Sequence, residues 1–246
     1  MTEQADVGSA SHQDVHSGAR QTLEAELAQV EQRIGEAIAE LFPPFSQMVA
    51  AQLRHSYPLI RAAVVLTAGV AAPDDAIVRD LRIDLAAAME MLHLAINVHM
   101  LLGEVASGEA PNPTVLGSTI LAGDYCFSRS ANLAARTGDP VVVEIFSNAL
   151  KRVSEGHLRR FFDPTSEAYN EDRELFVAGV NAAMHLGQSS AQARSEAIRI
   201  VEMLADHPKP TERVSLLPSF QSSLQNELAP NQYERWLAFL NWRADQ

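Results

Sequence analysis

Apolar residues recur every three or four positions over most of this chain, which is the spacing of one buried face of an α-helix. The first such stripe runs from Leu23 to Leu41 and stops at Pro43-Pro44, because proline disrupts a helix interior. A second helix is expected over Phe45 to Arg54. A third is expected to start near Pro58, a favoured residue in a first turn, and to end at Gly69.

The centre of the chain predicts one unusually long helix. It opens at Pro73 with two acidic residues, which suit a helix N-terminus, and no breaker follows before Gly103. After a loop rich in Gly, Pro and Asn, a helix is expected from Thr114 to Arg136 and another from Pro140 to the Asp163-Pro164 pair. The run Val141 to Val143 would also suit a strand, but the spacing of the apolar residues that follow favours a helix.

Three further helical segments complete the pattern, over residues 167–187, 190–207 and 232–242, and the last is expected to dock on the domain's own core. Alternation of period two is absent over any useful length, so no sheet is predicted. The chain is therefore expected to form a single all-α domain of about nine or ten helices over residues 21–246. Residues 1–20 are polar, lack the apolar stretch of a secretory signal, and are expected to be a disordered tail.

Composition narrows the class of protein further. Hydrophobic residues make up 47% and charged residues 20% of the 246 positions, which is ordinary for a globular domain. The net charge of −12 argues against a nucleic-acid partner, which requires a clustered basic surface. The longest apolar runs fall short of the roughly 20 residues of a membrane helix, so no transmembrane segment is expected. The single cysteine, Cys126, fits a reducing compartment, and we expect a cytoplasmic protein.

Few residues form a pattern typical of catalysis. Glu90 and His93 have the Glu-x-x-His spacing found in di-iron bundles, but such a site needs a second copy and the chain has none. A histidine hydrogen-bonded inside the core explains His93 more simply. His99 and Glu104 are five residues apart and lie on different helical faces, and Cys126 has no neighbouring ligand. The residue pattern alone therefore predicts no catalytic set.

Residues 121–125 read Leu-Ala-Gly-Asp-Tyr, and they are followed by a Gly-Asp-Pro turn at 138–140 and by Glu-Gly at 155–156. This segment, together with one upstream, resembles the trans-prenyl diphosphate synthases. Upstream, Glu90, His93 and His99 match the family's helix with Glu-x-x-His, an apolar run and His-Asp-Asp-x-x-Asp. The resemblance covers about residues 50 to 200 in order and spacing. It implies an isoprenoid-synthase-like helical fold.

The chain departs from this family at its metal and diphosphate groups. Met100 and Leu101 stand where the first two aspartates would hold magnesium, and only Glu104 keeps a carboxylate. The region beyond residue 190 lacks the Asp-Asp pair of the second aspartate motif, and the family's diphosphate clamp is reduced to Arg61. The resemblance therefore implies no cofactor of this chain's own, with Mg²⁺ expected only in a catalytic partner.

The family includes two-component enzymes, so the resemblance implies a non-catalytic subunit of a heteromeric long-chain polyprenyl diphosphate synthase that makes quinone side chains. Its partners would be the catalytic subunit and the growing isoprenoid chain, and it would be inactive alone. The alternatives are a homodimeric pseudoenzyme that binds an isoprenoid or another lipid, an enzyme with unusual ligands, and a helical domain unrelated to prenyl chemistry. The residues implied in the former active site or tunnel are Arg61, Glu90, His93, His99, Met100, Leu101, Glu104, Asp124 and Tyr125.

Overall fold

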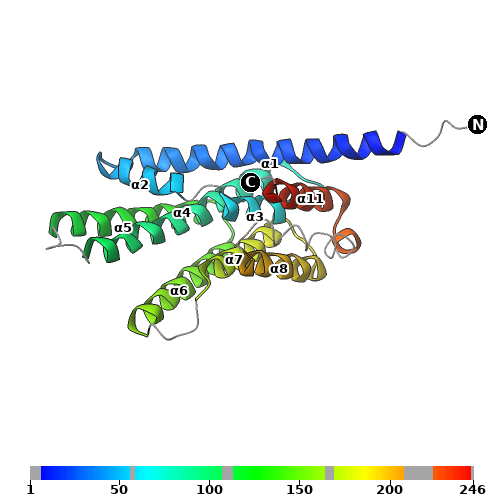
Figure 1. The fold of residues 1–246 in the computed structure, drawn as a ribbon. Helices are drawn as coiled ribbons and strands as arrows, with labels where there is room; N and C mark the ends of the chain where they lie inside the picture. The colour runs from blue at the N-terminus through cyan, green and yellow to red at the C-terminus, as the bar shows by residue number, and fades with distance from the viewer. Residues whose placement is uncertain (1–6, 56–58, 107–112, 164–168, 208–223, 245–246) are drawn as a thin grey trace, which may run out of the picture.

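The computed structural model describes residues 7–55, 59–106, 113–163, 169–207 and 224–244, and helices without any strand make up its regular structure over these ranges (Figure 1). The predicted all-α class is confirmed. The helices are α1 (Val7–Ala39), α2 (Phe45–His55), α3 (Ile60–Ala68), α4 (Ala76–Ala106), α5 (Pro113–Ala135), α6 (Pro140–Phe162), α7 (Glu171–Leu186), α8 (Ala191–Asp206) and α11 (Pro230–Ala244). The run Val141 to Val143 is helical rather than extended.

The first helix begins earlier than the sequence predicts. Helix α1 starts at Val7, so residues 7–20 are helical instead of forming a disordered tail, and only residues 1–6 of that tail lie outside the described residues. Residues 7–20 contain no proline, and each residue added to an existing helix gains one backbone hydrogen bond. The apolar stripe that starts at Leu23 indicates where α1 begins to pack on the core. The helix itself starts earlier, at Val7.

Helix α4 lies at the centre of the bundle, between α1, α3, α5 and α7 (Figure 1). Every residue from Ile83 to Leu92 is buried, and all of α3 is buried beside it. A stretch of α4, Ala76–Leu102, is long and apolar enough to cross a membrane by length and composition, which the search for apolar runs in the sequence missed. Its most apolar window is 67% buried inside the protein, as in the central helix of a bundle.

Polar side chains fix where the later helices begin. Asp139 accepts a hydrogen bond from the backbone N–H of Val141 at 2.8 Å, with proline at the first position of α6. Asn170 accepts from the N–H of Arg173 at 3.0 Å at the start of α7. These caps explain why α6 and α7 start where they do, and the second places an acidic first turn next to α3 and α4.

The C-terminal helix packs on the core, as expected. Trp236 and Phe239 of α11 are buried, and their rings meet edge to face with centroids 5.9 Å apart. Beside them, the guanidinium of Arg235 donates to the buried carboxylate of Glu26 in α1 at 3.0 Å. Glu26 also accepts from Arg82 of α4 at 2.6 Å, so one buried carboxylate joins three helices.

Candidate functional site

The candidate site is a shallow cavity of about 390 Å³ where the start of α7 meets α3 and α4. Its lining residues are Arg61, His93, Tyr169, Asn170, Glu171 and Asp172. Two of them, Arg61 and His93, belong to the residues that the sequence assigns to the former active site. The other four come from the start of α7 and the segment just before it, and sequence reasoning did not select any of them.

Glu90 holds the start of α3 and is not free to bind a ligand with its Oε1. That oxygen accepts hydrogen bonds from the backbone N–H groups of Arg61 at 2.8 Å and Ala62 at 3.0 Å. These are N–H groups of the first turn of α3, which have no partner within their own helix. Leu59, the N-cap residue, supplies no side-chain cap, so the buried carboxylate of α4 takes that role.

Arg61 is held between two carboxylates. Its guanidinium forms an ion pair with Asp172 of α7, and its Nη1 lies 3.8 Å from Oε2 of Glu90. The Arg61 side chain is 8% exposed, whereas that of Asp172 is 45% exposed and lies at the mouth of the cavity. A diphosphate that approached Arg61 would therefore meet a carboxylate already bound there. The charge of Arg61 is compensated within the protein.

Glu171 bridges two histidines from different helices. Its Oε1 lies 2.6 Å from Nδ1 of His93 in α4, and its Oε2 lies 3.0 Å from Nε2 of His157 in α6. The other ring nitrogen of His93 lies 2.9 Å from Nδ2 of Asn97, so the imidazole is held from both sides. Burial opposes ionisation of Glu171, but the hydrogen bonds from His157 and His93 and the charges of His93 and Arg61 outweigh it and lower its pKa to about 2.

Tyr169 closes the outer side of this cluster. Its ring meets the imidazole of His157 edge-on, with centroids 5.6 Å apart, and it covers Gly156, where a Cβ would come within 2.4 Å of the ring. Burial raises the pKa of the Tyr169 hydroxyl, and nearby Glu174 and Glu171 add to the shift. The Glu-Gly pair at 155–156 that the sequence aligns with prenyl synthases thus provides space for an aromatic ring.

The remaining predicted residues on α5 form a separate contact with α4. The His99 ring lies over Gly123, and its Nε2 is 3.3 Å from the carbonyl oxygen of Ile120 and 3.4 Å from Oδ1 of Asp124. The hydroxyl of Tyr125 donates to the carbonyl of Ala37 in α1 at 2.7 Å. The Leu-Ala-Gly-Asp-Tyr segment therefore packs α5 onto α4 and α1. None of these residues lines the cavity at Arg61.

Met100 does not fill a packed position. It is 52% exposed, so the domain itself does not bury this apolar residue. Leu101 is partly buried, whereas Leu94 and Ile96, one or two turns earlier, are in the core. The side chain of Glu104 lies outside the described residues. The exposed Met100 calls for a different explanation from packing within the chain.

The donor groups present do not fit the magnesium ions that a prenyl synthase requires. Met100 and Leu101 carry no oxygen ligand at the first aspartate positions, and Mg²⁺ is bound by oxygen. Within the residues that the structure describes, no group of three His, Cys, Asp or Glu side chains is arranged to hold a metal.

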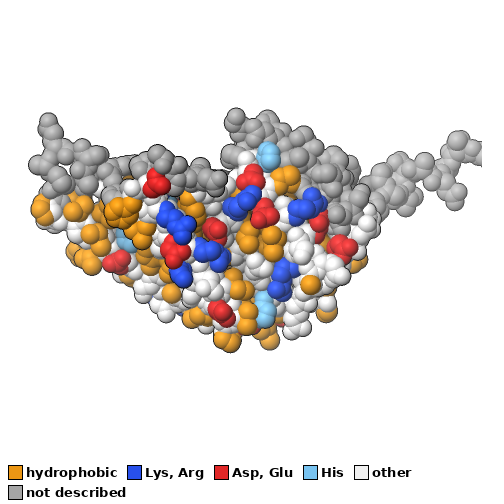
Figure 2. All heavy atoms as spheres, turned by 90° about the horizontal axis from the view of Figure 1, so that it is seen from below, with side chains coloured by type: hydrophobic (Ala, Val, Ile, Leu, Met, Phe, Trp, Pro, Cys, Tyr) orange, Lys and Arg blue, Asp and Glu red, His pale blue; other side chains and the backbone are white. Residues whose placement is uncertain are grey.

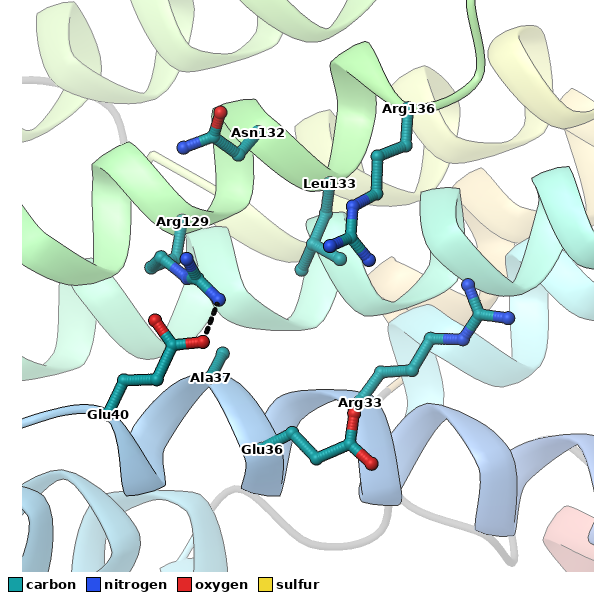
Figure 3. A pocket seen from close by; sticks show the side chains of 8 residues that line it. All are labelled: Arg33, Glu36, Ala37, Glu40, Arg129, Asn132, Leu133 and Arg136. Carbon is teal, nitrogen blue, oxygen red and sulfur yellow. Dashed lines mark hydrogen bonds and ion pairs between the residues drawn. The ribbon is translucent and has the colours of Figure 1, made fainter.

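A second cavity, of about 290 Å³, lies between α1 and α5 (Figure 3). Three arginines face it, but each has a carboxylate neighbour. Arg33 pairs with Asp80 and Asp84, Arg129 pairs with Glu40 at 2.8 Å, and Arg136 lies 3.9 Å from Asp84. Because the carboxylates balance the guanidinium groups, this groove is not an anion site. Its charged side chains join α1, α4 and α5.

Besides Tyr169 and Asn170, the site residues that the sequence did not reveal are His157, Glu171 and Asp172. The acidic first turn of α7 has a local explanation, since carboxylates stabilise a helix N-terminus. His157 follows the Glu-Gly pair at the end of the aligned segment. The residues next to it in the sequence do not indicate that its side chain takes part in a polar cluster. Their partners are 14 to 111 residues away along the chain, so only the packed structure brings them together.

The arrangement of helices is similar to that of solved prenyl diphosphate synthases. No protein-family model matches the sequence, and no curated protein matches it. Solved structures of similar fold include a decaprenyl diphosphate synthase from Rhodobacter capsulatus, with a TM-score of 0.61 and 23% identity over 82% of this chain and 66% of that one. A geranyltransferase from Legionella pneumophila has a TM-score of 0.68 and 13% identity over 94% of this chain and 98% of that one.

A geranyl diphosphate synthase small subunit from Antirrhinum majus is also similar, with a TM-score of 0.61 and 15% identity over 91% of this chain and 98% of that one. The chain thus spans about two thirds of the length of the decaprenyl synthase and nearly all of the small subunit. These similarities establish the fold of the chain, and they confirm the helical scaffold that the sequence resemblance implies.

Proposed function

We propose that this chain is the non-catalytic subunit of a heteromeric long-chain polyprenyl diphosphate synthase, in the cytoplasm, of the type that makes quinone side chains. Its role is to complete the assembly and to help shape the apolar path of the growing isoprenoid. The catalytic partner supplies the magnesium ions and the groups that ionise the diphosphate ester.

The observation that carries this proposal is the pairing of the two basic side chains left in the site. Arg61 is paired with Asp172, and His93 is hydrogen-bonded to Glu171. A catalytic site for a diphosphate needs these groups turned toward the substrate, because they stabilise charge on the leaving group. Here both bind carboxylates of α7, and the positions that would hold magnesium carry Met100 and Leu101.

The exposed apolar side chains near the α4–α5 contact support a subunit role. Leu121 is 70% exposed, Met100 52%, Val115 44% and Ile120 41%, and they come from the end of α4 and the first half of α5. A region of the surface that exposes several large apolar side chains together is often a site of interaction with another molecule. A contact with a second chain explains why Met100 is apolar although its own domain does not bury it.

The test is reconstitution with a full-length polyprenyl diphosphate synthase of the same organism that carries both aspartate motifs. We expect the mixture to form a complex and to gain turnover, or to change the length of its product, relative to that synthase alone. The variant Leu121→Glu is expected to weaken the complex at least tenfold, whereas Ile77→Glu, an equally exposed site at the start of α4, is expected to have no effect.

Two outcomes would contradict the proposal. If the mixture shows neither complex formation nor a change in turnover or product length, the subunit assignment fails. If the isolated chain is a stable homodimer that co-purifies with an isoprenoid, the lipid-binding pseudoenzyme is the better description. Native mass spectrometry of the isolated chain and of the mixture distinguishes these cases.

A further inference from the structure

The end of α6 carries exposed apolar and cationic side chains together. Leu158 is 56% exposed and Phe162 is 79% exposed. They are four residues apart, so they lie on the same side of the helix. Arg159 and Arg160 stand between them in the sequence, and both are exposed in the last turn. This end of the helix projects beyond the rest of the bundle at the lower left of Figure 1.

The two arginines have no carboxylate partner among the described residues. Other cations of α6 do have one, since Arg152 pairs with Glu174 at 2.6 Å and Lys151 lies 3.9 Å from Glu155. Across the face that α6, α7 and α8 present in Figure 2, basic and acidic side chains are interspersed in the same way. Arg159 and Arg160 therefore leave a local positive charge on a chain whose net charge is −12.

We propose that this end of α6, formed by Leu158, Arg159, Arg160 and Phe162, docks the protein on an anionic lipid surface. The apolar pair enters the boundary between headgroups and acyl chains, and the guanidinium groups bind lipid phosphates, as in other peripheral proteins. The inference does not depend on the subunit assignment. If that assignment holds, docking brings the assembly next to the bilayer into which a long isoprenoid product partitions.

The shape of this region favours a membrane over a protein partner. A stable protein–protein interface buries about 800 Å² on each partner, which one projecting helical turn does not provide. A bilayer is deformable, and it accepts a single Leu and Phe without a complementary groove. Asp163, which follows the turn, is exposed and reduces the local charge without cancelling it, and the exposed Glu155, one turn before Arg159, lies 3.9 Å from Lys151.

The experiment is sedimentation of the isolated chain with vesicles of phosphatidylcholine containing phosphatidylglycerol, compared with phosphatidylcholine alone. We expect binding to the anionic vesicles that is weak, lost at high salt, and absent from the neutral ones. Each arginine near an anionic surface contributes about fivefold, so Arg159→Glu with Arg160→Glu is expected to lower the binding constant by about 25-fold or more. Phe162→Ser is expected to lower it by about tenfold.

Two matched variants serve as controls. Arg54→Glu replaces an exposed arginine in α2. Ile77→Ser replaces an apolar side chain in α4 that is 73% exposed. Both are expected to bind vesicles like the wild-type chain, and thermal unfolding checks that every variant remains folded. The proposal is overturned if the chain does not bind anionic vesicles, if it binds both kinds equally, or if the control variants lose as much binding as those of α6. Because no partner subunit is present, none of these results bears on the subunit assignment.

Discussion

The imidazole ring of His99 lies so close to the backbone of Gly123 that a Cβ at position 123 would stand 2.3 Å from two of its ring atoms. A real Cβ does not tolerate such a contact, so α4 and α5 approach each other at this point only because residue 123 is glycine. The Leu-Ala-Gly-Asp-Tyr segment thus has a structural requirement that is independent of catalysis. Packing explains it in a chain that carries Met100 and Leu101 where the resembling family has its first two aspartates.

Gly123→Ala is therefore expected to destabilise the protein by about 1–3 kcal/mol, because His99 must move or the two helices must separate. Gly117→Ala on the same helix is the control. A Cβ at Gly117 meets nothing within 4 Å, and alanine is the better helix former, so this change is expected to stabilise the fold by about 0.5–1 kcal/mol. Urea denaturation of both variants measures the difference. Equal effects of the two changes would show that the His99 contact is not limiting.

Substitutions of Glu90 test whether the glutamate of the Glu-x-x-His pattern stabilises the fold. Glu90→Ala leaves two buried N–H groups of α3 without an acceptor and takes a charge from beside Arg61, so the expected loss is about 3–5 kcal/mol. Glu90→Gln keeps one acceptor oxygen and is expected to cost less, about 1–2 kcal/mol. Glu36→Ala, an exposed site, is expected to change stability by no more than about 0.5 kcal/mol. A Glu90→Ala protein as stable as Glu36→Ala would refute this role.

The sequence predicts the scaffold better than it predicts the site. Helix boundaries follow from local features such as the cap at Asp139 and the break at Pro43-Pro44, which is why most elements agree within a few residues. The pairing of Arg61 with Asp172 joins residues 111 positions apart, and no local pattern marks it. Exposure of Met100 is equally non-local, because it depends on which helices cover the end of α4.

Glu171 makes stability depend on pH in the acidic range. Its pKa is lowered from the ordinary value of 4.5 to about 2, so the folded state favours the ionised carboxylate. That contribution is fully present above the unfolded pKa and is lost as pH falls from about 4.5 through about 2. The shift corresponds to about 3 kcal/mol at most. Glu171→Gln is therefore expected to be less stable than wild type at pH 7 and nearly equal to it near pH 2.

Unfolding of both proteins by urea across this pH range checks the prediction. Glu155→Gln is the control, because Glu155 is half exposed and its nearest cation, Lys151, lies 3.9 Å away. The free energies of unfolding of wild type and Glu155→Gln are expected to differ by no more than about 0.5 kcal/mol at every pH. If the difference in unfolding free energy between wild type and Glu171→Gln were the same from neutral to acidic pH, the two histidines would not hold the carboxylate ionised.

Met100→Asp restores the first aspartate of the family pattern at a site that the domain leaves half exposed. Because the new carboxylate remains in water, the expected cost is within about 1 kcal/mol. Val98→Asp, two residues earlier, places a charge at a position with 0% exposure and is expected to cost more than about 4 kcal/mol. Thermal unfolding distinguishes the two. If Met100→Asp were as damaging as Val98→Asp, packing within the chain would explain the methionine after all.

The double variant Met100→Asp with Leu101→Asp is expected to remain without prenyl-transfer activity when it is assayed alone with Mg²⁺. Two oxygen ligands on α4 supply part of one metal site, while Arg61 and His93 stay bound to Asp172 and Glu171, where they cannot stabilise a leaving diphosphate. A full-length synthase in the same assay provides the positive control. Magnesium-dependent condensation by the lone double variant would show that the carboxylates of α7 yield to substrate, and would contradict the view that they neutralise the site.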